Sequence, residues 1–434
     1  MKKNMTKLVI FFCTMQLPLS GIAQEILTKS RAVEIALSHN FDIRAIENDL
    51  SVSKNNQSYQ NSGFLPSLTG NAGADYSRAF IPTDSVLRQA DTKVYSAGLH
   101  LDYTIFNGFG RRYNYTRLKE EYKLTELQAK AVMENTLLNL FTVYYEIARL
   151  RMNEISELEN LAISKQRLKR AQYSYEYAQT SKLDVLNAEV DFNNDSIQYL
   201  RILQQLVNQK HHLNLLLGRD IATTFEVDTT LVFASGLTLE STLEAALVRN
   251  SDLLQQESTL RNTDISIKAA DARAIPEIGV YTSYGWSNTE RVIPFQQNFQ
   301  SHTIALGASL RWNIWDGGIS NTQKQNARLA KEKQQVLVNK AKISLEKDLA
   351  DAWTDYQTAQ LIMSTQQKSM SVNEQNFERT KDNYALGRVT NIAFREAQSN
   401  LLAARISLNS ARFDAKMTEL VLLRLSGRIL ESEF

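Results

Sequence analysis

Cysteine, proline and glycine are scarce in this chain of 434 residues, which has 1 cysteine, 5 prolines and 16 glycines. The single cysteine, Cys13, lies near the start, so the rest of the chain can form neither a disulfide bond nor a cysteine-ligated metal site. Prolines are the main interruptions of helices, and none occurs in residues 83–275 or 295–434. Long helices are therefore permitted over most of the sequence.

Residues 1–23 have the layout of a secretory signal peptide, with a basic start, a short apolar run and a small-residue site ending at Ala23. The run is shorter than the roughly 20 residues that a spanning helix needs, so we expect cleavage and not an anchor. Without this segment, acidic and basic residues nearly balance, which gives no electrostatic case for nucleic-acid binding. No later run of 18 or more apolar residues occurs, so membrane contact would require strands or an amphipathic surface.

The rest of the chain is a tandem duplication. Residues 27–43 align with residues 237–253, and the alignment continues to the C-terminal part of each copy. Identical pairs along it include Asn40/Asn250, Pro66/Pro276, Gly108/Gly317, Tyr175/Tyr384 and Gly218/Gly427. A repeat of this length is too long for a solenoid, so each copy is half of one architecture. We assign residues 24–225 to the first repeat and 226–434 to the second.

Within each copy the apolar residues change from a period of two, typical of strands, to a helical period. The predicted strands span about residues 67–77, 95–106, 277–287 and 302–315. The predicted long helices span about residues 112–174, 183–216, 319–383 and 390–425. At about 1.5 Å per residue the longest would be close to 100 Å, which suits a coiled coil or a structure that crosses a wide compartment such as the periplasm.

The four predicted strands have about the length of tilted transmembrane β-strands, roughly ten residues. Four strands cannot close a membrane barrel, because such barrels begin at about eight, and an open edge in lipid would leave backbone groups unpaired. Several chains must then share one barrel. Two chains would give a filled interior of about eight strands, and three would give about twelve strands and room for a channel. A soluble sheet packed on helices is the alternative, but it does not account for the leader and the very long helices.

The duplicated order of motifs resembles the outer membrane efflux protein family, the TolC-like channel-tunnels. The motifs are the "LT…A…AL..N" openings, "PSL" before the first strand, the "IFNG" and "IWDGG" junctions, and a "Y..G" turn between long helices. The resemblance implies a mainly α fold with membrane β: a homotrimer with a shared twelve-stranded β-barrel in the outer membrane of a Gram-negative bacterium, continued by a coiled-coil α-barrel across the periplasm.

The same resemblance implies a passive exit duct of a tripartite efflux or type I secretion system, without enzymatic activity or cofactor. The implied partners are outer-membrane lipid, a periplasmic adaptor (membrane fusion) protein and an inner-membrane pump of the RND, ABC or MFS type. A periplasmic coiled-coil adaptor or structural protein is the alternative function. An adaptor would normally have one helical hairpin between Gly-rich β-domains, whereas this sequence predicts two hairpins at equal spacing.

In the family the periplasmic tips of the hairpins form a closed entrance, held by tyrosine, basic and acidic residues. Here the tips are residues 175–189 and 384–398. The candidate entrance residues are Tyr175, Asp184, Asn187, Tyr384, Gly387, Arg388 and Glu396. Ala178 replaces the family's glycine, so the left-handed turn that glycine permits is less expected in the first copy. Arg388 lies one residue before the family's usual basic position.

Each tip keeps one of the two carboxylates. Ala393 stands opposite Asp184 in the alignment of the copies, and Asn187 stands opposite Glu396. We expect the two carboxylates to face the entrance and favour cations, as acidic rings do in other channels. Equally, both could be ordinary solvated helix residues.

The Asx-Gly pairs at 107–108 and 316–317 could form hairpin turns, but long Pro-free helical sequence follows each of them. We therefore expect strand-to-helix junctions in which the Asx side chain caps the helix. The junction residues are Phe106, Asn107, Gly108, Trp315, Asp316 and Gly317. Tyr103 and Trp312, near the strand ends, are expected at headgroup depth. Five scattered histidines and no serine elbow or phosphate loop predict no catalytic, cofactor or metal site.

Overall fold

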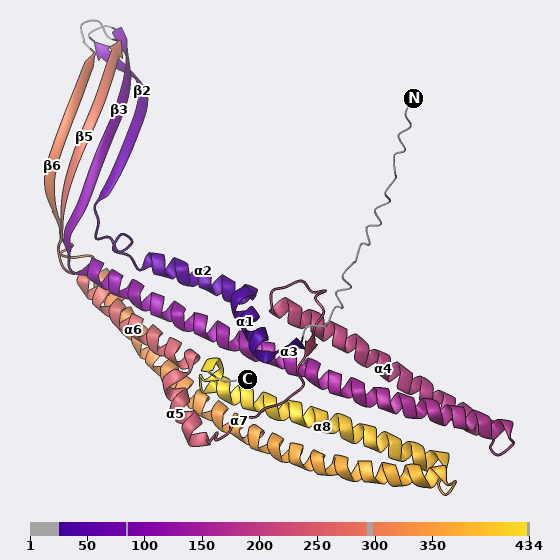
Figure 1. Ribbon diagram of the computed structural model, residues 1–434. Coiled ribbons are helices and arrows are strands. Elements are labelled where there is room, and N and C mark those ends of the chain that lie inside the picture. Colours follow the sequence, from indigo (N-terminus) through magenta and orange to yellow (C-terminus); the bar gives the residue numbers. More distant parts are fainter. Residues whose placement is uncertain (1–25, 84–85, 293–297, 432–434) are drawn as a thin grey trace, which may run out of the picture.

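The computed structural model describes residues 26–83, 86–292 and 298–431, and shows an elongated molecule with a curved sheet at one end and long helices at the other (Figure 1). The expected leader, residues 1–23, lies outside the described residues. Both copies have the same order of elements, which confirms the duplicated, mainly helical architecture.

The first copy contributes α1 (Lys29–His39), α2 (Phe41–Asn56), β2 (Ser67–Thr83), β3 (Val86–Asn107), α3 (Gly110–Glu176) and α4 (Lys182–Leu216). The second contributes α5 (Leu239–Arg249), α6 (Ser251–Ala272), β5 (Glu277–Val292), β6 (Phe299–Arg311), α7 (Ile319–Ala385) and α8 (Asn391–Leu425). Two short strands, β1 (Ile26–Leu27) and β4 (Glu226–Val227), pair in parallel, and a 3-10 turn, η1 (Ile429–Glu431), follows α8.

The four long strands form an antiparallel sheet in the order β2-β3-β5-β6. Because successive side chains in a strand point to opposite faces, one face collects the large apolar residues of the alternating runs. We call it the apolar face; it includes Leu99, Leu101, Ile304, Leu306 and Leu310. On the opposite face of β6, the residues between Phe299 and Arg311 at its ends are small, such as Ala305 and Gly307. Leu306 is 83% exposed, so none of the residues that the structure describes covers the apolar face there.

Several predicted strand boundaries are wrong. β6 ends at Arg311 and not near residue 315, because its partner β5 begins at Glu277, and the residue before it, Pro276, has no N–H to continue the ladder. The β2–β3 hairpin extends well beyond residues 77 and 95. Its outer part is held by polar pairs such as Arg78 Nε to Asp91 Oδ1 at 2.8 Å, which carry no apolar alternation for a sequence prediction to detect.

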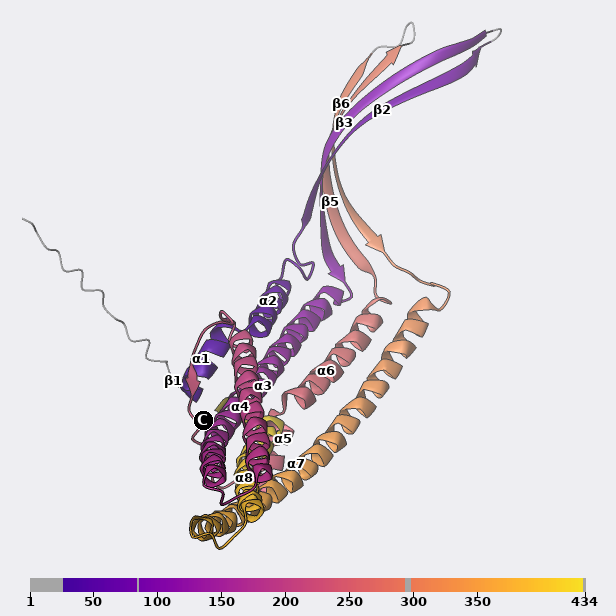
Figure 2. The same cartoon turned by 90° about the vertical axis from the view of Figure 1, so that its right-hand side faces the viewer.

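The helices lie side by side in two tiers (Figure 2). Next to the sheet the order is α2, α3, α6 and α7, and farther away it is α4, α3, α8 and α7. The long helices α3 and α7 belong to both tiers. We call α3 with α4 hairpin 1 and α7 with α8 hairpin 2. In a single chain the helical layer therefore ends in α2 and α4 on one side and in α7 on the other.

The main hydrophobic core lies halfway along the helices, around the middle of α3. Leu140, Phe141 and Tyr144 recur there at helical spacing and are fully buried. The Tyr144 hydroxyl donates to the Leu27 carbonyl at 2.7 Å and accepts from the Asp228 amide at 3.0 Å, so it fastens β1 and β4 to the helix. Burial raises the pKa of Tyr144 to about 12, so its hydroxyl stays a donor at neutral pH.

The repeated asparagines join the start of one helix to the end of another. The Asn40 carboxamide oxygen accepts from the first-turn amides of α2, and its nitrogen donates to the Leu216 carbonyl at the end of α4, at 2.8 Å. Asn250 likewise accepts from the Leu253 amide of α6 and donates to the Leu425 carbonyl at 3.0 Å. Each asparagine thus satisfies helix-end groups of both partners, which are otherwise unpaired.

The repeated glycines end α4 and α8 where the chain passes close to a neighbouring helix. Gly218 and Gly427 have positive φ angles of +64° and +68°. A Cβ atom at Gly218 would lie 2.2 Å from the His39 carbonyl oxygen, and one at Gly427 would lie 2.6 Å from that of Arg249. No other residue fits, so these identities between the copies are structural.

Candidate functional site

The two hairpin turns have the same backbone conformation although their residues differ. Gly387 has φ +72°, and Ala178, its counterpart in the first copy, has φ +55°. In hairpin 1 the Gln179 amide donates to the Ser174 carbonyl at 2.8 Å, and in hairpin 2 the Arg388 amide makes the equivalent bond at 2.8 Å. These helix-ending hydrogen bonds hold the left-handed residue in place, so the turn that we expected less in the first copy is present in both.

Asp184 caps the start of α4. Its carboxylate accepts from the Thr180 hydroxyl and from the Ser181 hydroxyl and amide, at 2.8 Å and 3.2 Å for the last two. The Ser181 hydroxyl in turn accepts from the Asp184 amide at 3.3 Å, which completes a capping box. The hydrogen bonds from Thr180 and then Ser181 lower the pKa of Asp184, so it is ionised at neutral pH.

The other predicted polar tip residues stay apart in a single chain. Glu396 and Asn187 are exposed on α8 and α4, and among the described residues no hydrogen bond or ion pair joins either of them to Asp184. In the second copy Thr390 caps α8 by itself, accepting from the Ala393 amide at 3.2 Å.

Tyr384 is held between the two hairpins. Its ring stacks on Phe394 with centroids 4.6 Å apart, and the Arg170 guanidinium of α3 lies 4.6 Å from the ring centroid. Arg170 also donates to the Tyr384 and Ala385 carbonyls at 3.2 Å and 3.4 Å. Tyr175, its counterpart, is 45% exposed, and Lys182 Nζ of its own hairpin lies 5.4 Å from its ring centroid.

Arg170 lies less than two helical turns before the end of α3. The turn of hairpin 2 therefore rests against the side of hairpin 1, whose own tip reaches farther (Figure 1). Arg388, the basic residue among the entrance candidates, is exposed, and in this chain Arg170 binds the tip of hairpin 2. Arg170 was not among the tip residues predicted from the sequence.

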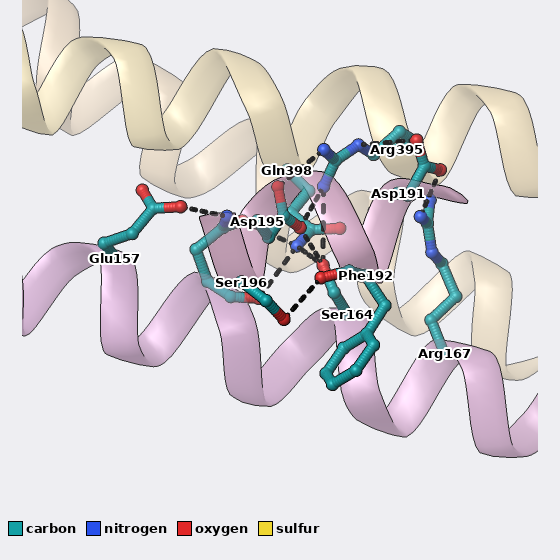
Figure 3. A network of polar contacts seen from close by, with 10 residues as sticks. Glu157, Ser164, Arg167, Asp191, Phe192, Asp195, Ser196, Arg395 and Gln398 are labelled. Atoms are coloured by element: carbon teal, nitrogen blue, oxygen red, sulfur yellow. Dashed lines mark hydrogen bonds and ion pairs between the residues drawn. The ribbon is translucent and has the colours of Figure 1, made fainter. Parts of the chain in front are cut away.

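A buried polar network joins the hairpins just above this contact (Figure 3). Arg395 of α8 binds Asp195 of α4 with two hydrogen bonds of 2.7 Å and 2.8 Å, a bidentate geometry that strengthens the pair. The Ser164 hydroxyl of α3 donates to the same carboxylate. Only 7% of the Asp195 side chain is exposed. One carboxylate thus connects three helices from both copies.

Gln398 extends the network along α8. Its amide nitrogen donates to the Asn160 side-chain oxygen at 2.6 Å and to the Ser164 hydroxyl at 2.9 Å. Glu157 accepts from the Asn160 side-chain nitrogen at 3.3 Å, and burial raises the pKa of the Glu157 carboxyl. The inter-hairpin network, as we call it, consists of Glu157, Asn160, Ser164, Arg167, Asp191, Asp195, Arg395 and Gln398.

A pattern in the sequence could have located one side of this network. Glu157, Asn160, Ser164 and Arg167 follow each other at spacings of three and four residues, the positions that are apolar in an ordinary coiled coil. All four are buried. A polar seam of this kind indicates specific partners, although it does not say which helix provides them.

The junction residues cap α3 and α7 from a short distance upstream. Asn107 accepts from the Arg111 amide at 3.2 Å, and Asp316 accepts from the Ser320 amide at 2.9 Å. The residue directly before each helix is left-handed: Phe109, with φ +68°, and Gly318, with φ +89°. Gly108 and Gly317 precede them, also at positive φ.

The junction aromatics differ in their surroundings. Phe106 packs edge-on against Phe109 with centroids 5.4 Å apart, whereas Trp315 is 87% exposed. Tyr103 lies under Arg111, and the Trp312 indole donates to the Ala274 carbonyl at 3.3 Å. Among the described helices, none combines the length and the apolar character needed to cross a membrane.

Known proteins match this chain over both copies. The profile of the family described as "Outer membrane efflux protein" matches residues 32–219 and 242–428. The outer membrane efflux protein BepC of Brucella suis biovar 1 is 19% identical over 95% of this chain and 88% of its own. The toluene efflux pump outer membrane protein TtgC of Pseudomonas putida is 20% identical over 91% of this chain and 82% of its own.

Solved structures share the fold. The CmeC outer membrane channel of Campylobacter jejuni has a TM-score of 0.78 at 17% identity and covers 92% of this chain and 86% of its own. VceC of Vibrio cholerae has a TM-score of 0.74 at 18% identity, over 92% and 96%. The two hairpins and the matches to both copies agree with the export duct and not with the single-hairpin adaptor. The predicted resemblance is confirmed: this chain belongs to the outer membrane efflux protein family, whose members reside in the outer membrane.

Proposed function

We propose that this chain forms the exit duct of a tripartite efflux or type I secretion system, as a passive homotrimer with a twelve-stranded barrel. The observation that carries the proposal is that the sheet has two unpaired edges, β2 and β6, in a chain whose apolar face is uncovered. Since neighbouring strands alternate in direction, β6 of one chain can pair antiparallel with β2 of the next. A head-to-tail contact of this kind closes into a ring, and three chains give about twelve strands, enough for a channel.

The free edges of the helical layer support the same ring. α4 has exposed apolar residues at spacings of three, four and seven. α7 has them at spacings of seven in the half that lies next to the sheet. They are Leu183, Leu186, Val190, Ile197, Leu200 and Val207 on α4, and Leu329, Val336 and Ile343 on α7. Burying apolar surface is worth about 25 cal/mol per Å², so contact of α7 of one chain with the next chain's α2, beside the sheet, and with its α4, farther from the sheet, would stabilise the α-barrel.

The entrance would then contain three copies of each hairpin tip, with Asp184 and Glu396 each present three times. We propose that these carboxylates favour cations in the passage. Because Asp184 also caps its own helix, Glu396 should contribute more to the preference. In planar bilayers, Asp184→Asn with Glu396→Gln should reduce the cation-to-anion permeability ratio; an unchanged ratio would show that both are ordinary solvated residues.

The family and the names of the relatives support partners on the periplasmic side. TtgC is named as part of an efflux pump, so we propose that a periplasmic adaptor and an inner-membrane pump of the RND, ABC or MFS type deliver cargo to this duct. The duct itself would catalyse no reaction and would need no cofactor.

Two neighbouring residues on β6 provide the test. Leu306 lies on the apolar face and Ala305 on the opposite one. An arginine on a lipid-facing strand position costs about 2–4 kcal/mol at mid-membrane, whereas one facing the lumen mainly changes selectivity. Leu306→Arg should strongly reduce the heat-sensitive trimer in the outer-membrane fraction, and Ala305→Arg should leave the trimer and shift conductance. A soluble periplasmic wild-type monomer, or equal effects of the two variants, would refute the proposal.

A further inference from the structure

A cleft of about 500 Å³ opens between the end of α6 and the start of α7, beside the second strand-to-helix junction. Its lining combines small, polar and aromatic residues. Those that matter here are Asp271, Ala274, Ile314, Trp315, Ser320 and Lys324.

In the first copy, side chains fill the equivalent space. Tyr115 stacks on Tyr59 with ring centroids 4.6 Å apart, and Phe64 packs edge-on against both rings. The Arg111 guanidinium covers Phe64 at 5.2 Å. Aligning the copies shows the exchanges Phe64 to Ala274, Arg111 to Ser320 and Tyr115 to Lys324. The cleft is therefore the space that aromatic side chains occupy in the other copy.

The cleft opens on the side of the apolar face. Trp312 follows the last residue of β6, and alternation places it on the same face as Leu310. Its indole nitrogen donates to the carbonyl of Ala274, which lines the cleft. Ile314 and Trp315, at the rim, are 80% and 87% exposed. If the sheet crosses the outer membrane, the cleft lies at the headgroup layer of the periplasmic leaflet, where barrel aromatics gather.

The polar side of the cleft carries one charge of each sign. Lys324 Nζ lies 2.6 Å from Asp271 Oδ1, and their side chains are 37% and 46% exposed. A cation and an anion at one mouth complement the phosphate and the ammonium of a zwitterionic headgroup. The exposed Ile314 and Trp315 provide apolar surface for the adjoining acyl chains.

We propose that this cleft binds one glycerophospholipid per chain, with a headgroup that contains a phosphate and an ammonium group. The inference rests on the proposed placement of the sheet in the outer membrane. The lipid would fill the space between α6 and α7 as Phe64 and Tyr115 fill it between α2 and α3, and would thereby fix the second junction.

The test is native mass spectrometry of the purified full-length protein in detergent with dioleoyl-phosphatidylethanolamine added. The wild type should retain one lipid per chain at collision energies that strip the lipid from Ala274→Phe with Lys324→Tyr, which restores the side chains of the first copy. A second variant, Asp271→Asn with Lys324→Gln, keeps the shape of the cleft and should weaken retention about tenfold. The matched control is Asp264→Asn with Lys331→Gln, which removes another ion pair between the same helices, 2.7 Å long and outside the cleft lining, and should change nothing.

Equal lipid retention by the wild type and by Ala274→Phe with Lys324→Tyr, which we call the filled variant, would overturn the inference. So would loss of the trimer in the filled variant alone, because the cleft would then hold a neighbouring chain. A wild-type protein that is monomeric would contradict the proposed function, but the number of lipids retained per chain would still decide for or against the cleft.

Discussion

Inside the chain, α3 of the first copy contacts α8 of the second. When the copies are exchanged, the corresponding helices are α7 and α4, whose faces are free in a single chain. In the proposed trimer, α7 of one chain would meet α4 of the next just as α3 meets α8. The interface inside the chain contains the buried ion pair between Arg395 and Asp195. In the alignment of the copies, Arg395 corresponds to Leu186 and Asp195 to Ala404, so the free faces have no such pair. The internal interface is held by this directional charge pair, which the outer faces lack at the equivalent positions. We infer that the two hairpins of a chain move together and that the entrance opens between chains.

The arginine and the tyrosine of the tip contact are the same in both copies. Arg170 and its counterpart Arg379 are identical, as are Tyr384 and Tyr175. Inside the chain, Arg170 covers Tyr384. Arg379 and Tyr175 are both exposed in the single chain, so the same contact is available between one chain and the next.

The largest expected effect concerns the internal interface. Arg395→Ala leaves the Asp195 carboxylate buried without its partner, which costs about 3–5 kcal/mol. Thermal unfolding of the purified protein, followed by circular dichroism, should show this loss as a lower melting temperature. Arg405→Ala is the control: its partner Glu159 is 55% exposed, and such pairs contribute about 0–1 kcal/mol.

The double variant Arg395→Leu with Asp195→Ala introduces the residues of the other copy. It should recover most of the lost stability, since replacing a buried pair by apolar groups is often close to neutral. If Arg395→Ala costs no more than Arg405→Ala, the network does not hold the hairpins together.

A smaller effect is expected at the interface between chains. Arg379→Ala should remove the contact with the next chain's tyrosine, at about 0.5–1 kcal/mol for an exposed cation–π pair, and so increase the frequency of channel openings in planar bilayers. Lys381→Ala is the control, because Lys381 pairs with Glu378 of its own helix at 3.1 Å. Equal opening frequencies in the two variants would exclude the repeated contact.

The smallest effect compares the two turns. Ala178→Gly relieves a left-handed conformation that costs about 1–2 kcal/mol for a residue with a Cβ. Glycine also makes the unfolded chain more flexible, which offsets about 0.4–1 kcal/mol of this gain in the free energy of unfolding. Hydrogen exchange at the Gln179 amide should slow slightly. Gly387→Ala should speed exchange at the Arg388 amide by a similar factor; faster exchange in Ala178→Gly would contradict the strain.

Elements with a strong period could be predicted from the sequence. The alternation of Ile304, Leu306 and Leu310 identified β6 and its apolar side, and the Pro-free stretches identified the long helices. The end of β6 could not be predicted, because it depends on Pro276, the residue just before the paired strand β5. The site was predictable only in part: the tip segments were located, and Asp184 proved to be a capping residue, but Arg170 was not recognised because nothing near it in sequence marks its partner.

By itself the sequence determined the duplication, the kind and order of the elements and the apolar face of the sheet, because these follow from periodicities within a few residues. The tertiary structure decided which charges meet, how far hairpin 2 reaches along hairpin 1 and that Ala178 takes a left-handed turn. Arg395 and Asp195 are 200 residues apart in the chain. Only the packing of one copy against the other brings them together, since a local pattern carries no information about the helix that will lie opposite.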